Sequence, residues 1–125
     1  MARLTVLDTT VLVDHLRGSE PARSFLQSLP VVPACSELTR TELLRGTRSG
    51  ERRATETLMA MIRWIPVDET ISRRAGDLGR RYRRSHAALG LADLVIAATA
   101  EEVDAALATS NVRHFPMFKG LKPPY

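Results

Sequence analysis

Hydrophobic positions along the chain follow two periods, one typical of short buried strands and one typical of amphipathic helices. Four short apolar runs predict strands at residues 3–7, 31–35, 64–67 and 105–109. Apolar side chains at three- and four-residue spacing predict helices over residues 11–16, 20–29, 37–46, 51–62, 69–85 and 91–100. Strands that alternate with helices in this way favour an α/β fold, a mostly parallel sheet with helices on both faces.

The end of the chain has a weaker pattern. Residues 112–115 predict one turn of helix, and residues 119–125 predict an edge strand that ends at Pro123 and Pro124. The sequence contains no internal repeat or low-complexity segment. A length of 125 residues predicts a single domain over residues 1–125, so any partner must be bound by the module that carries the chemistry.

Composition and charge narrow the classes of function. Hydrophobic residues make up 44% of the chain and charged residues 26%, which is typical of a globular protein and excludes a disordered one. Lysine and arginine number 18 against 14 acidic residues, a formal net charge of +4 that is nearly all arginine. This excess of positive charge favours a polyanionic partner.

Cysteine usage and the amino-terminal segment indicate the compartment. Cys35 is the single cysteine, so no intramolecular disulfide can form, and a reducing cytosol is expected. The apolar residues 4–7 are interrupted by Asp8 well before they reach the length of a signal peptide or a membrane span. We therefore expect a cytoplasmic protein with no membrane association.

Four oxygen-bearing side chains are candidates for a metal site. Asp8 follows the first predicted strand, Asn111 follows the fourth, and Glu42 and Asp93 lie in predicted helices. In open α/β sheets, ligands bind beyond the carboxyl ends of the strands. Carboxylate and amide oxygens suit a hard divalent cation such as Mg²⁺ or Mn²⁺, which can activate water against a phosphodiester. The sequence therefore predicts a small metal-dependent nuclease.

Each of these residues also has a structural interpretation. Asp8 can simply cap the helix that follows it, and Asp93 can gain about 0.3 to 1 kcal/mol from the dipole of its helix. Glu42 can form a surface pair with Arg45, worth about 0.2 to 0.5 kcal/mol. Asn111 can be a turn residue, because asparagine tolerates left-handed backbone angles. The joint placement of the four side chains is what favours a site.

Four blocks of sequence, in this order and spacing, resemble a known family. They are V-L-D-T-T at residues 6–10, T-E-L-L-R-G at 41–46, A-D-L-V-I-A-A-T-A at 92–100 and L-A-T-S-N-V-R-H-F at 107–115. Together they resemble a PIN-domain protein, specifically a VapC-type toxin of a bacterial toxin–antitoxin pair. The resemblance covers essentially the whole chain.

The resemblance implies a Rossmann-like sheet, a homodimer and a Mg²⁺-dependent endoribonuclease restrained by a VapB-type antitoxin. Transfer RNA is the first substrate class to expect. By the same resemblance, Asp8 and Asp93 contact the metal directly and Glu42 completes the catalytic set. Asn111 matches a fourth metal-binding position that is aspartate in many relatives. Because asparagine adds no charge, the number of ions, one or two, is left open.

Other residues of these blocks leave alternatives open. Thr9 and Thr109 can hydrogen-bond the ligand carboxylates or only the backbone, and His114 is expected to interact locally rather than to catalyse. The arginine-rich segment 73–84 can contact RNA or an antitoxin, or it can be a solvated helix face. A PIN-like module that binds RNA or a partner without cleaving it, and a nuclease that acts on DNA, are the alternative functions.

Overall fold

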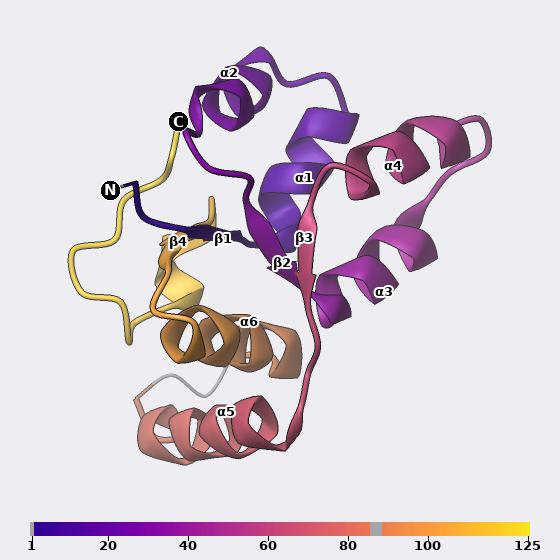
Figure 1. Cartoon of the computed structure of the whole chain (residues 1–125). Coiled ribbons are helices and arrows are strands. Elements are labelled where there is room, and N and C mark those ends of the chain that lie inside the picture. Colours follow the sequence, from indigo (N-terminus) through magenta and orange to yellow (C-terminus); the bar gives the residue numbers. More distant parts are fainter. Residues whose placement is uncertain (1, 86–88) are drawn as a thin grey trace.

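The strands form one parallel sheet, as the alternation of strands and helices predicted. The computed structural model describes residues 2–85 and 89–125 (Figure 1). Its strands are β1 (Thr5–Leu7), β2 (Ala34–Ser36), β3 (Arg63–Ile65) and β4 (Ala106–Ala108). The sheet order is β3-β2-β1-β4, and each neighbouring pair is parallel. Because β1 and β4 are parallel neighbours, their carboxyl ends lie side by side at one end of the sheet.

Helices cover both faces of this sheet (Figure 1). They are α1 (Thr9–Leu16), α2 (Glu20–Ser28), α3 (Glu37–Gly46), α4 (Arg52–Met59), α5 (Glu69–Tyr82) and α6 (Leu91–Glu102), followed by the 3₁₀ turn η1 (Val112–His114). Successive residues of β1 point to opposite faces, so Val6 packs with α5 and α6 while Leu7 packs with α1, α3 and α4. Two apolar clusters, one on each face, thus hold the sheet between two helical layers.

Polar side chains set the start of several helices. Asp8, Ser19, Ser36 and Asp68 are the N-cap residues of α1, α2, α3 and α5, and each side chain accepts a hydrogen bond from a backbone N–H of the first turn. Asp8 and Ser36 also directly follow or end a strand. β1 and β2 thus pass almost directly into α1 and α3 at the end of the sheet where polar residues were predicted to gather.

All four strands are shorter than predicted or shifted from the predicted bounds, and the differences are clearest for β2 and β3. Residues 31–33 do not join the sheet, and β2 instead extends to Ser36; Pro33 has no backbone N–H to donate and contributes only its carbonyl, which accepts from Arg63. The third strand ends at Ile65 instead of Val67. In both cases the apolar run is longer than the segment that pairs.

The edge strand predicted at residues 119–125 was also wrong, because this segment has no regular structure. It crosses instead to α1 and α2, where the Tyr125 ring packs edge-on against Phe25 with centroids 6.1 Å apart. The Tyr125 hydroxyl donates a hydrogen bond to Asp14. Two prolines and this aromatic contact favour the crossing over pairing with β4.

Within the described residues, no helix has the length and apolarity needed to cross a membrane.

Candidate active site

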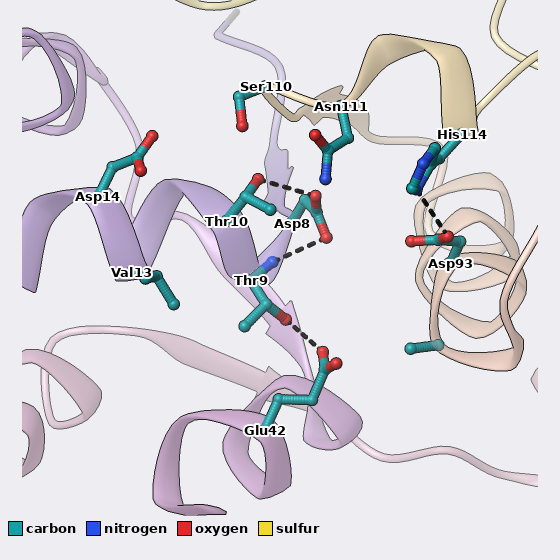
Figure 2. Close-up of a pocket in the computed structure, with 11 residues that line it drawn as sticks. Asp8, Thr9, Thr10, Val13, Asp14, Glu42, Asp93, Ser110, Asn111 and His114 are labelled. Carbon is teal, nitrogen blue, oxygen red and sulfur yellow. Dashed lines mark hydrogen bonds and ion pairs between the residues drawn. The ribbon is translucent and has the colours of Figure 1, made fainter. Parts of the chain in front are cut away.

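The four candidate residues line one cavity of about 440 Å³ at the carboxyl ends of β1 and β4 (Figure 2). Asp8 directly follows β1, and Asn111 lies three residues beyond the end of β4. Glu42 comes from the middle of α3, and Asp93 from the first turn of α6. Residues that are far apart in the sequence thus share one opening, as predicted.

Asp8 is both a helix cap and a wall of the cavity. Its side chain is buried and accepts hydrogen bonds from Thr9 N at 2.9 Å, Thr10 Oγ1 at 2.9 Å and Thr109 Oγ1 at 2.7 Å. Its own backbone N–H donates to Ala108 O at 2.8 Å. Three donors around one buried carboxylate satisfy its oxygens and fix its orientation. The capping interpretation is correct, and it does not compete with a place in the site.

Glu42 is held by a threonine rather than by an arginine. Its Oε1 accepts a hydrogen bond of 2.6 Å from Thr9 Oγ1, which also lies 3.0 Å from Thr39 Oγ1. In the described part of the chain, Arg45 forms no ion pair with Glu42, so the alternative interpretation of Glu42 as half of a surface pair is wrong. Because Thr9 also bonds Asp8 through its backbone N–H, one residue links the two carboxylates.

Asp93 lies across the cavity and has a histidine partner (Figure 2). Its Oδ2 is 3.0 Å from His114 Nδ1, and its side chain is 19% exposed. Partial burial raises the pKa of Asp93 above its usual value, and the charge of Asp8 raises that pKa further, while His114 opposes both effects. Negative charge in this cavity is therefore under mutual repulsion, which a bound cation would relieve.

Asn111 has its position fixed through its backbone. Its N–H donates to Thr109 Oγ1 at 3.0 Å, and its φ of −99° is not left-handed, so tolerance of such angles does not explain this residue. Figure 2 shows its amide directed into the cavity above Asp8. The hydroxyl of Thr109 therefore contacts both Asp8, which follows β1, and Asn111, which lies beyond β4.

The set of donors fits a hydrated cation better than a closed metal cage. Among residues 2–85 and 89–125, no three His, Cys, Asp or Glu side chains approach closely enough to enclose an ion. Asp8 and Glu42 lie on one side and Asp93 on the other (Figure 2). Mg²⁺ is typically bound through one or two carboxylates and retains several waters, so an open cavity whose candidate ligands offer oxygens suits it.

Sequence reasoning missed some residues of the cavity, above all Asp14 and Ser110. Asp14 lies four residues after Thr10 on α1, so the helical period places it on the same face and could have identified it. His114 was expected to interact locally, which is correct, but its partner is a carboxylate of the site. That contact joins η1 to α6 and has no signal in the spacing of the sequence.

Comparison with known proteins agrees with this architecture. The sequence matches the PIN domain family over residues 5–119. The chain therefore belongs to the PIN-domain family.

Comparison with individual proteins narrows the group. The chain is 49% identical over 126 residues to Ribonuclease VapC10 and to Ribonuclease VapC19 of Mycobacterium tuberculosis. These alignments cover 98% of this chain, 93% of VapC10 and 100% of VapC19. A chain of a toxin-antitoxin complex from Klebsiella pneumoniae has 27% identity and a TM-score of 0.84, covering 97% of this chain and 98% of that one. Within the family the chain thus falls among the VapC-type proteins, as its motifs predicted.

Proposed function

We propose that this chain is a Mg²⁺-dependent endoribonuclease toxin that hydrolyses RNA phosphodiester bonds. One observation supports this most strongly: a single cavity gathers the carboxylates of Asp8, Glu42 and Asp93 in a PIN-domain chain. The chain is 49% identical, over 98% of its length, to two proteins named as ribonucleases. Transfer RNA is the first substrate to test.

Asp8, Glu42, Asp93 and Asn111 would hold the metal. Their oxygens suit Mg²⁺, with Mn²⁺ as a substitute. When bound, the ion supplies positive charge against the phosphate and makes a neighbouring water more acidic. The threonine hydroxyls and His114 hold the carboxylates in place, because each contacts one carboxylate oxygen at 2.6 to 3.0 Å.

Glu42 is the best placed residue to accept a proton from the attacking water. Its Oε1 is occupied by Thr9, whereas among the described residues no hydrogen bond is made to its Oε2. Asp8, by contrast, uses both oxygens in hydrogen bonds, so its role is to position and neutralise rather than to take up a proton. A general base must be free to reach the proton that it removes.

Cleavage of transfer RNA tests the proposal. The purified chain should cut RNA in Mg²⁺, EDTA should stop the reaction, and Asp8→Asn, Asp93→Asn or Glu42→Gln should abolish it without unfolding the domain. Asp77→Asn is the matched control, because Asp77 is an exposed carboxylate on α5 outside the cavity. Folded chain that binds RNA but neither cleaves it nor takes up Mg²⁺ in calorimetry would be a non-cleaving module. Parallel digestion of DNA decides between the two nucleic acids.

The proposed partner is a VapB-type antitoxin, and the proposed location is the cytoplasm. A second cavity of about 690 Å³ supports a protein partner, because it is lined by apolar side chains that remain exposed, Val32 at 61% and Met61 at 60%. We also propose a homodimer. Added antitoxin should stop cleavage, and sedimentation of the free chain should give the mass of two copies.

A further inference from the structure

The arginines of α5 and of the turn that follows it, which contains Arg83 and Arg84, fall into two groups that differ in their partners. In the first half of the helix, Arg73 Nε lies 2.8 Å from Glu69, and Arg74 lies 2.9 Å from Glu102 and 3.5 Å from Glu101. The charges of these two arginines are therefore balanced within the protein. Their half of the helix is a surface of paired charges, which contributes little to the binding of another molecule.

The second group has no such balance. It consists of Arg80, Arg81, Arg83 and Arg84, which we call the terminal arginine cluster; all four are exposed. Within the described residues, none of the four forms an ion pair with an acid. Their four charges equal the whole formal excess of +4 of the chain. The four positive charges at the end of α5 are thus as many as the net positive charges of the whole chain.

This cluster adjoins the turn of the fold that carries Asp93. A Cβ at Gly79 would lie only 3.1 Å from Leu94 Cδ1, so α5 and α6 are in close contact at this point. Leu94 follows Asp93 in the first turn of α6, and Arg80 follows Gly79. The buried residues of α5 face α6, and the arginines occupy the remaining, solvent-facing side. The unbalanced charge therefore lies on the element packed beside the cavity.

We propose that the terminal arginine cluster binds backbone phosphates of the RNA next to the bond that is cleaved. This inference rests on the proposed function, since it supplies the substrate contact that the acidic cavity itself cannot make. Phosphates require only exposed positive charge, whereas a protein interface requires an apolar centre. The four arginines surround no exposed apolar side chain of their own segment, which favours RNA over an acidic protein.

Salt dependence of RNA binding tests this contact. The probe is fluorescein-labelled bulk transfer RNA, titrated in a KCl series against the Asp8→Asn chain, which should not cleave it. Changing all four arginines of the cluster to glutamine should reduce the slope of log Kobs against log [KCl] by about 3, because each phosphate contact contributes roughly 0.7 to 0.9.

The control removes the same charge elsewhere. Arg23, Arg52, Arg53 and Arg63 are equally exposed and lie on α2, α4 and β3, and changing them to glutamine also lowers the formal charge from +4 to 0. This control should change the slope by less than about 1. Equal slopes for the two variants would overturn the inference. A cluster variant that keeps its RNA slope but loses binding to poly-L-glutamate would assign the cluster to an acidic protein instead.

Two further measurements keep the result interpretable. If the fourfold variant does not fold, as judged by circular dichroism, the pairs Arg80/Arg81 and Arg83/Arg84 are changed separately, and each should remove about half of the effect. Cleavage by the unsubstituted chain is measured in parallel. If the unsubstituted chain cleaves RNA but the cluster variant keeps its salt slope, the proposed function stands and the role of the cluster is refuted. If the unsubstituted chain does not cleave RNA but the cluster variant has a smaller slope, the proposed function fails and the RNA contact stands.

Discussion

Replacing Thr109 by valine should destabilise the fold more than the loss of an ordinary buried hydroxyl would. Valine keeps the shape but removes the donor that lies 2.7 Å from Asp8 Oδ2, in a place where both side chains are buried. A hydrogen bond to a charged group contributes about 1.5 to 3 kcal/mol. The Asn111 N–H also loses its acceptor at 3.0 Å, which adds roughly 0.5 to 1 kcal/mol. The expected loss is therefore about 2 to 4 kcal/mol.

Urea denaturation measures this loss as a lower midpoint with an unchanged slope m. Thr99→Val is the matched control, because Thr99 is equally buried but donates to Val95 O, a neutral carbonyl, at 2.7 Å. That change should cost less than about 1 kcal/mol. In an Asp8→Asn background, where the acceptor is neutral and the bond to it contributes about 0.5 to 1.5 kcal/mol, the cost of Thr109→Val should fall to about 1 to 2.5 kcal/mol. Equal losses for Thr109→Val and Thr99→Val would refute the reasoning.

Three further predictions follow from the titratable groups. Burial raises the pKa of Cys35 to about 12, so its thiol should stay protonated at neutral pH and react with Ellman's reagent only after unfolding; rapid reaction of the native protein would contradict this. Because burial raises the pKa of Asp93, its charge disfavours the folded state at neutral pH; Asp93→Asn in EDTA should melt higher than the unsubstituted chain. This gain should disappear as the pH falls below the ordinary aspartate pKa of 3.8, because the side chain is then protonated in both the folded and the unfolded state. A lower melting temperature of Asp93→Asn than of the unsubstituted chain at neutral pH would contradict the prediction. His114→Gln should weaken Mn²⁺ binding in calorimetry about tenfold or more, since His114 holds Asp93 at 3.0 Å; unchanged affinity would leave the contact a local one.

The sequence predicted the layers of the fold because hydrophobic residues recur with a different period in strands than in helices. Val6 and Leu7 show this most clearly, since adjacent apolar residues of one short strand fill two separate cores. The ends of strands were less accurate, because Val31 and Val32 are as apolar as a strand requires yet remain exposed. An apolar run shows what can be buried, and only the neighbouring elements decide what pairs.

The sequence predicted four of the side chains that line the cavity, but not the contacts between them. Asp8 could be found because it interrupts an apolar segment at a strand end. The hydrogen bond between Thr9 and Glu42 joins positions 33 residues apart in the sequence, and that between Tyr125 and Asp14 joins positions 111 residues apart. Such pairs depend on how whole elements dock, which no local period records. The roles of the carboxylates in metal binding and catalysis stay predictions.

The hydrogen bond between Thr109 and Asp8 joins positions 101 residues apart, between the first strand and the last. During synthesis, Asp8, Glu42 and Asp93 have all emerged from the ribosome once the chain has emerged as far as the end of α6. The hydroxyl and the strand that hold Asp8 in place are still missing at that moment. The nascent polypeptide therefore lacks an ordered acidic pocket until β4 docks.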